Sequence, residues 1–246
     1  MPSAAAALLL LFPVRLFAAS AASSSYIRAP GVPLSPADSA AAVVEKAAIR
    51  MDLGPFRTAL SPDLVDFLLD HPDLSASLAR GLGLAPYSSF ALGSGAFSVD
   101  DGAGSRGSLV LTERGKGERV YYIEGVHESP LLPAIRAAAV VRIALKRIPH
   151  FECRSSDTES EFEVYVRFRS HALSGLARAL RPVARRIIAR KFARGMEVAD
   201  KLGRLMAEDP RLVAETIESL QTAAPQDKDR LLGLMSAMNA GAAVCY

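Results

Sequence analysis

Hydrophobic and polar positions along this chain follow two periods, one typical of helices and one typical of strands. From about residue 35 to 51, from 61 to 83 and again after 170, apolar residues recur every three or four positions, as they do on the buried face of an amphipathic helix. Between about residues 87 and 169 the spacing changes to two, the period of a strand with one buried face. The pattern therefore predicts an α+β protein with its strands in the middle of the chain.

Two short helices are predicted directly ahead of the strands. Ser61 precedes Pro62, and a serine cap followed by proline in the first turn is a common helix start. Pro72 stops this helix and begins another, which Gly81 closes. These two helices follow the longer helical pattern of residues 35–51.

Five runs have the period of a strand, at about residues 87–99, 107–114, 118–128, 137–147 and 158–169. The last run has an apolar side made of Phe162, Val164, Val166 and Phe168. The fourth run has one made of Ala139, Val141, Ile143 and Leu145. One dry and one wet face are typical of an antiparallel sheet. Gly93 and Gly95 in the first run predict a bulge or sharp bend, which would let the sheet curl.

The longest helical pattern is predicted to begin at Pro182 and end at Glu208, because proline inside a helix costs about 3 kcal/mol. Its length is roughly 40 Å at 1.5 Å per residue, enough to cross a sheet. Two weaker helices follow at about 211–222 and 227–239. We therefore expect a curved antiparallel sheet of five to six strands that grips a long C-terminal helix, with extra helices at both ends.

The N-terminus has the form of a targeting segment. Residues 4–14 are apolar but too few for a membrane span, which needs about 20 residues, and Ala19-Ser20-Ala21 matches a signal-peptidase pattern. No acidic residue precedes Asp38, which also suits an organellar transit peptide. We expect a signal peptide at 1–22 and a flexible leader at 23–37, with export to the periplasm or the outside, or alternatively organellar import.

The order of two short helices, antiparallel strands and one long closing helix resembles the START-like, or helix-grip, superfamily of polyketide cyclases and lipid-transfer domains. The resemblance covers about residues 58–208 and includes the strand-to-helix transition at 162–170. The chain is also similar to uncharacterised bacterial members of that superfamily. These similarities lie in Asp63-Leu-Val-Asp-Phe-Leu-Leu-Asp-His-Pro72, Asp100-Asp-Gly-Ala-Gly104 and Tyr122-Ile-Glu-Gly-Val-His127.

The resemblance implies a START-like domain at 38–209, followed by a helical extension at 210–246. It also implies a cavity between sheet and helix that takes apolar or lipid-like ligands. The superfamily usually has a strand before its helix pair, and here the short segment 49–53 is the candidate for it. A lost or displaced first strand would leave a sheet edge that other elements must cover.

Small residues recur every four positions on the apolar face of the long helix, at Gly195, Ala199 and Gly203. Each glycine costs about 1 kcal/mol relative to alanine inside a helix, so the structure should offset that cost. Two interpretations stay open: close packing of the backbone against a neighbour, or room left for a ligand. The second predicts a pocket lined by Tyr122, Val141, Ile143, Phe162, Val164, Val166, Ile188, Phe192, Gly195, Met196 and Ala199.

The same helix carries a basic run without an acidic residue before Glu197. A solvated helix face would explain the run, and docking on anionic lipid headgroups is the alternative, at about 1 kcal/mol per basic residue. Nucleic acid is disfavoured as a partner, because the net charge is only +3 and the expected export would separate the protein from nucleic acid. The predicted membrane-surface residues are Arg185, Arg186, Arg190, Lys191 and Arg194.

The chain shows no nucleophile elbow, phosphate loop or dinucleotide fingerprint. An enzyme of the cyclase, isomerase or hydrolase type would need Glu124, Tyr122 and Arg142 to converge inside the cavity. His127 and Glu128 lack a third ligand for a metal site. We therefore expect a carrier without cofactor or metal, with an enzyme on the same fold or an envelope scaffold as the alternatives.

Composition adds little to this interpretation. Half of the residues are apolar, ample for a core, and tryptophan is absent from the sequence. Two cysteines, Cys153 and Cys245, are too few for a disulfide framework. In an oxidising compartment they could pair, and the opposite outcome, two unpaired thiols, stays equally open.

Overall fold

The computed structural model describes residues 35–93, 95–129, 132–149, 156–169 and 177–242. These residues form six helices and one antiparallel sheet of seven strands, and all of them belong to one compact unit. The predicted signal peptide and both cysteines lie outside the described residues. The predicted leader at 23–37 is too long, because Ser35 already caps the first helix and its hydroxyl accepts from the N–H of Asp38.

The first helix and the first strand divide a segment that the helical pattern had joined. Helix α1 is Pro36–Glu45 and strand β1 is Ile49–Thr58. The predicted helix to Met51 is therefore wrong at its end, and the first strand is neither lost nor short. Ile49 and Met51 are buried and Arg50 is exposed, the alternation of a strand with one covered face.

Helices α2 (Pro62–Asp70) and α3 (Pro72–Gly81) lie where the two proline signals place them. The Ser61 hydroxyl accepts from the N–H of Leu64, at 3.4 Å, and so caps α2. The buried residues of α2 include Leu64 and Phe67. The predicted helix pair is confirmed in position, and so is the serine cap of α2. Helix α3 has no side-chain cap at His71, and its C-cap is Leu82 instead of Gly81.

The sheet has the order β1-β7-β6-β5-β4-β3-β2 and is antiparallel throughout. Its further strands are β2 (Ser88–Gly93), β3 (Ala96–Asp100), β4 (Ser105–Gly115), β5 (Glu118–Ser129), β6 (Leu132–Pro149) and β7 (Ser156–Phe168). The predicted count of five to six strands is wrong for two reasons. Strand β1 was expected at most as a short candidate at 49–53, the beginning of which was also assigned to a helix. The predicted run 87–99 is a hairpin of β2 and β3, with positive φ at Gly93 and Gly95.

The long helix α4 is Ala177–Glu208 and spans 32 residues. It begins five residues before Pro182, so the predicted start is wrong. Near the beginning of a helix, proline removes one backbone hydrogen bond and leaves the rest of the ladder intact, which limits the cost. Helices α5 (Pro210–Ser219) and α6 (Pro225–Ala242) follow it.

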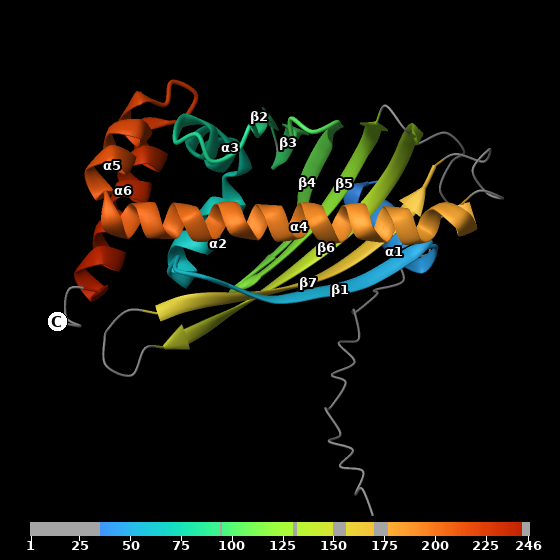
Figure 1. The fold of residues 1–246 in the computed structure, drawn as a ribbon, viewed down its shortest axis with the longest axis horizontal. Coiled ribbons are helices and arrows are strands. Elements are labelled where there is room, and N and C mark those ends of the chain that lie inside the picture. The colour runs from blue at the N-terminus through green and yellow to red at the C-terminus, as the bar shows by residue number, and fades with distance from the viewer. Residues whose placement is uncertain (1–34, 94, 130–131, 150–155, 170–176, 243–246) are drawn as a thin grey trace, which may run out of the picture. The chain divides into compact units, whose positions relative to one another are not determined.

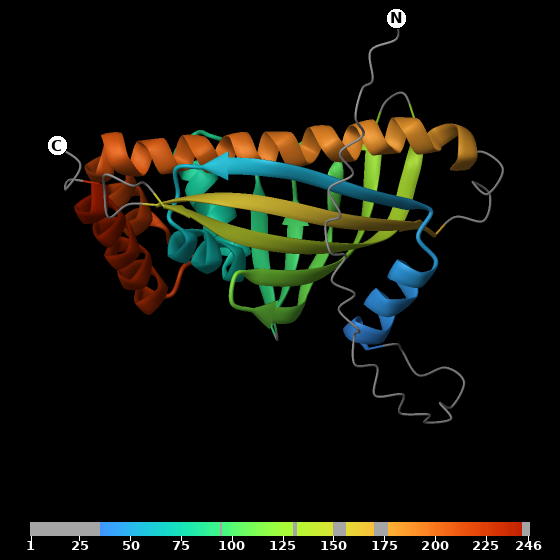
Figure 2. The same cartoon turned by 90° about the horizontal axis from the view of Figure 1, so that it is seen from below.

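Helices cover both faces of the sheet. Figures 1 and 2 show α4 running along one face and α1 on the other. On the α4 face, Ala184, Ile188 and Phe192 pack against a cluster that includes Val141 and Val164. On the α1 face, Ala40 and Val43 pack with Tyr122, Val140 and Tyr165. The buried strand residues of these two clusters are thus covered by α4 on one face and by α1 on the other.

The last two helices are part of the core. Val213 and Ile217 of α5, Leu231 of α6, and Leu64 and Leu78 of α2 and α3 are 0% exposed and belong to one cluster. Leu202 and Met206 at the end of α4 join the same cluster. The predicted division into a domain at 38–209 and an extension at 210–246 therefore does not match this packing.

Candidate ligand cavity between the sheet and α4

A cavity of about 730 Å³ lies between α4 and the sheet. Its wall includes ten of the eleven predicted ligand residues. They are Val141, Ile143, Phe162, Val164 and Val166 from the sheet, and Ile188, Phe192, Gly195, Met196 and Ala199 from α4. The alternation in β7 and β6 is sufficient to place the sheet residues, because side chains two apart point to the same face.

Tyr122 does not line the cavity and was assigned to the wrong face. It packs against α1 on the other side of the sheet, and the neighbouring Tyr121 lines the cavity instead. In β5 both tyrosines are buried, at 4% and 7% exposure, since each face of the sheet is covered by a helix. Two adjacent aromatic residues in such a strand do not reveal which of them faces which side.

The two glycines of α4 have different surroundings. A side chain at Gly203 would meet the backbone of the segment after β1, with the Leu60 nitrogen 3.0 Å from its Cβ. A side chain at Gly195 would meet nothing within 4 Å, and Gly195 lines the cavity. Both interpretations of the small-residue pattern are thus realised, each at a different position: close packing at Gly203 and open space at Gly195.

Aromatic rings connect the helix to the sheet beside this space. The rings of Phe162 on β7 and Phe192 on α4 meet edge to face with centroids 5.0 Å apart. Phe56 of β1 meets Phe162 in the same manner at 5.9 Å. Such pairs stabilise by about 0.5–1.5 kcal/mol beyond the area they bury, so the Phe162–Phe192 pair helps to hold α4 against the sheet.

Polar groups gather where the β3–β4 connection approaches α4. Lys191 of α4 pairs with the carboxylate of Asp101, and both residues line the cavity. The other Asp101 oxygen accepts the N–H groups of Ala103 and Ser105, at 2.8 and 2.9 Å. Burial raises the pKa of Asp101, but the bond from Lys191 and these backbone bonds outweigh it and hold the pKa below its ordinary value.

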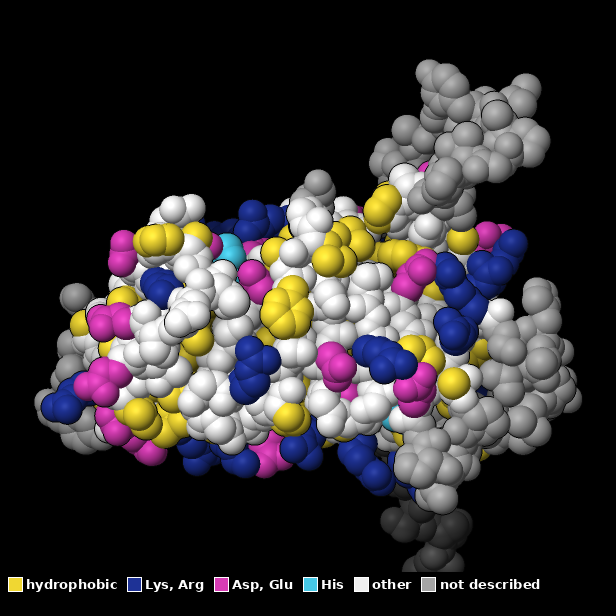
Figure 3. Space-filling model, turned by 90° about the horizontal axis from the view of Figure 1, so that it is seen from above, with side chains coloured by type: hydrophobic (Ala, Val, Ile, Leu, Met, Phe, Trp, Pro, Cys, Tyr) yellow, Lys and Arg dark blue, Asp and Glu magenta, His cyan; other side chains and the backbone are white. Residues whose placement is uncertain are grey.

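The predicted membrane-surface residues do not form one set. Arg185, Arg186, Arg190 and Arg194 are exposed, whereas Lys191 points to the cavity and pairs with Asp101. Lys191 is therefore a wrong member of that set. On the face shown in Figure 3, basic and acidic side chains are interspersed and apolar ones lie among them. Docking of the four arginines on anionic lipid stays a prediction.

The polar residues that an enzyme was expected to need do not converge in the cavity. Tyr122 donates to Glu124, and Arg169 pairs with the same carboxylate. Arg142 lies 3.9 Å from Glu163 and is about half exposed. Neither Glu124 nor Arg142 is part of the cavity wall. This catalytic arrangement is contradicted by the structure.

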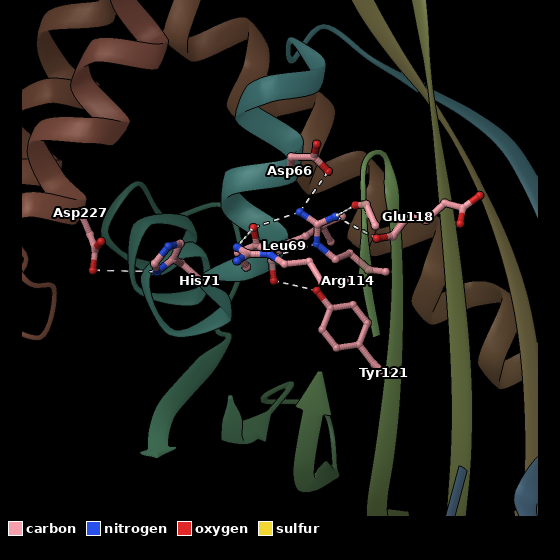
Figure 4. Close-up of polar contacts among 10 residues, drawn as sticks. Asp66, Leu69, His71, Arg114, Glu118, Tyr121 and Asp227 are labelled. Carbon is pink, nitrogen blue, oxygen red and sulfur yellow. Dashed lines mark hydrogen bonds and ion pairs between the residues drawn. The ribbon is translucent and has the colours of Figure 1, made fainter. Parts of the chain in front are cut away.

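A buried ion cluster, which the sequence patterns did not reveal, fixes the cavity wall to α2. The Arg119 guanidinium donates to both oxygens of Asp70, at 2.7 and 2.9 Å, and lies 3.3 Å from Asp66. Arg114 pairs with Asp70 as well, and Tyr121 donates to the Leu69 carbonyl at 2.7 Å. Figure 4 shows Arg114 and Tyr121 reaching toward the end of α2. Burial, followed by the charge of Asp70, raises the pKa of Tyr121, so its hydroxyl stays a donor.

No protein-family model matches the chain, and no curated protein matches it. The functional site is therefore inferred from the geometry. Among the described residues, no helix combines the length and apolar character needed to cross a membrane. Nor does the described part of the chain hold a group of three or more His, Cys, Asp or Glu side chains placed to bind a metal ion. The described feature that best suits ligand binding is the mainly apolar cavity between the sheet and α4.

Proposed function

We propose that this protein is a helix-grip carrier of the START-like type that holds an apolar or lipid-like molecule between its sheet and α4. The observation that carries the proposal is the cavity of about 730 Å³ with its largely apolar wall. Small-molecule sites are typically about 300–1,000 Å³ and mainly apolar. Because interiors are otherwise close-packed, a space of this size beneath a well-anchored helix favours a ligand.

Burial of apolar ligand surface would supply most of the affinity. Each Å² removed from water contributes about 25 cal/mol, reduced by the entropy lost on binding. The wall is preformed on rigid elements, because the sheet residues are held by the strand ladder and α4 is anchored by Phe162 and Phe192. A preformed wall lowers the ordering cost of binding.

The test is binding of diphenylhexatriene, a hydrocarbon fluorophore, to the purified chain, together with mass spectrometry of its solvent extract. We expect saturable fluorescence enhancement and a copurifying lipid. Gly195→Leu, which places a side chain into the open space, should weaken binding at least about tenfold, equivalent to about 1.4 kcal/mol. Its fold should persist, since nothing lies within 4 Å of the new Cβ.

Gly233→Leu is the matched control. Gly233 is an exposed glycine inside α6, and a Cβ there also meets nothing within 4 Å. It gives the same change in helix propensity far from the cavity wall, so binding should stay at the wild-type level. An unchanged affinity in Gly195→Leu, or no binding to the wild-type chain, would reject the carrier proposal.

A further inference from the structure

The cavity wall contains a buried hydroxyl without a hydrogen-bond partner. Ser89 lies on edge strand β2 opposite Val99 of β3, and both residues line the cavity. Ser89 is 6% exposed, and its Oγ has no partner in the described part of the chain. A buried polar group left unpaired costs about 1–3 kcal/mol. A ligand atom that bonds Ser89 would recover that cost.

Polar side chains near Ser89 distinguish the β2–β3 end of the cavity from the rest of its wall. Asp100 and Asp101 directly follow Val99, and Ser105 bonds His127 at 2.9 Å across the next strand pair. All of these residues line the cavity. Thr58, on the opposite edge strand β1, also has a buried hydroxyl without a described partner. The charged wall residues Asp100, Asp101, Arg106 and Lys191 belong to the β3–β4 region and to the part of α4 that pairs with it, so the polar cluster marks the Ser89 end.

The two cations of the wall at this end are already paired with acids. Lys191 pairs with Asp101, and Arg106 donates to both oxygens of Glu128 at 3.0 Å. Asp100 and Asp101 add two carboxylates to the wall, while Lys191 and Arg106 are the cations there. Arg80 and Arg194 bond Tyr87 from outside the wall and are exposed, so no cation of the described wall is left to pair with a buried carboxylate head. An ion buried without a partner is costly. An uncharged head avoids this penalty.

We infer that the ligand is an amphiphile with an uncharged hydrogen-bonding head, a hydroxyl or a carbonyl, bound to Ser89 at the β2–β3 end of the cavity. Its apolar chain lies along the wall formed by β5–β7 and α4. A serine hydroxyl both donates and accepts, so it serves a long-chain alcohol or a carbonyl-bearing lipid equally well. The inference rests on the proposed carrier function and adds the chemical class of the ligand.

Displacement of diphenylhexatriene by dodecanol and by dodecanoic acid, at neutral pH and on the full chain, tests this inference. The two competitors have the same chain and differ in head charge. Dodecanol should displace the fluorophore at an about tenfold lower concentration, the equivalent of about 1.4 kcal/mol. Ser89→Ala should raise the dodecanol concentration about fivefold, the effect of one hydrogen bond, after correction for the diphenylhexatriene affinity measured on the same variant.

Ser98→Ala is the control, because Ser98 is the β3 residue before Val99 and is not part of the cavity wall. It should leave both competitors unchanged. Dodecanoic acid binding as well as dodecanol, or dodecanol displacement unaffected by Ser89→Ala, would overturn the inference while the carrier function stands. A wild-type chain that does not bind diphenylhexatriene would instead reject the carrier function, and this inference with it.

Discussion

At the scale of single residues, Arg119 determines how α2 is attached to the sheet. Its side chain is 4% exposed, and that of Asp70 is 11% exposed. Arg119 also donates to the carbonyl of Glu118, at 2.8 Å. A buried ion pair adds little net stability by itself, but removal of one partner leaves the other charge uncompensated. The cluster therefore makes Arg119 difficult to replace.

Arg119→Met is expected to lower the free energy of unfolding by about 3–5 kcal/mol, since it leaves Asp70 without its bidentate partner. Arg114→Met is the matched control. Arg114 pairs with the same carboxylate but is 60% exposed, and exposed pairs contribute about 0–1 kcal/mol. Urea denaturation followed by circular dichroism measures both. Equal losses in the two variants would contradict the structural role assigned to burial.

Single residues also show where sequence patterns stop being informative. The alternation of apolar and polar residues in β7 places Phe162 and Val164 correctly, because the residues on one face of this strand are apolar in the sequence. Alternation cannot separate Tyr121 from Tyr122, because in β5 both faces are covered. Ser89 gives no signal either, since its significance comes from a missing partner, a property of the folded structure. In the sequence, Lys191 cannot be distinguished from its basic neighbours. Only the folded structure places it beside Asp101, 90 positions away.

At the scale of elements, helix α4 was predicted better than strand β1, because the apolar pattern is continuous in α4 and interrupted in β1. Strand β1 contains Gly54-Pro55, where the register with β7 shifts between Leu53 and Phe56, and this break interrupts the alternation. Gly54 has a φ of +112°, and a Cβ there would lie 2.8 Å from the Ser160 carbonyl oxygen. Helix α4 has a continuous apolar stripe over many turns, so its existence is readable in sequence and its first residue is not.

Gly203→Ala tests the close approach between α4 and the segment after β1. Alanine gains about 1 kcal/mol of helix propensity, but its Cβ would lie 3.0 Å from the Leu60 nitrogen and 3.1 Å from the Ala59 carbonyl carbon. We expect a net loss of about 1–2 kcal/mol, because backbone atoms cannot give way easily. Gly195→Ala, in open space on the same helix, should gain up to about 1 kcal/mol. Thermal denaturation of both variants gives the sign, and a stabilised Gly203→Ala would refute the packing argument.

At the scale of the whole molecule, long-range contacts join parts that the sequence separates. Helices α5 and α6 complete the cluster of α2 and α3, more than 100 positions earlier in the chain. Sequence patterns predicted these two helices, but an extension and a core element have the same amphipathic pattern. The cavity depends on similar contacts, because its wall combines β2, β7 and α4. The location of the cavity beneath the long helix was expected from the fold resemblance, whereas its polar end near Ser89 was not.

The pH dependence of stability should report these long-range contacts. Burial raises the pKa of Asp70, but hydrogen bonds from Arg119 and Arg114 outweigh it, and the pKa lies below its ordinary value. The pKa of Asp101 is lowered as well. A carboxyl with a lowered pKa in the folded state stabilises the protein above its unfolded pKa of about 3.9. That stabilisation is lost as the pH falls through the folded value.

We therefore expect the free energy of unfolding to stay level from neutral pH to about pH 5 and to fall below that. Asp70→Asn lacks the titrating group at the cluster, so it should be less stable than the wild type at neutral pH. The difference should shrink as the pH drops, because only the wild type loses a charge at this position. Urea titrations at several pH values measure it, with the exposed Glu113→Gln as control. A difference that stays constant down to about pH 3 would mean that the charge of Asp70 does not link α2 to the sheet.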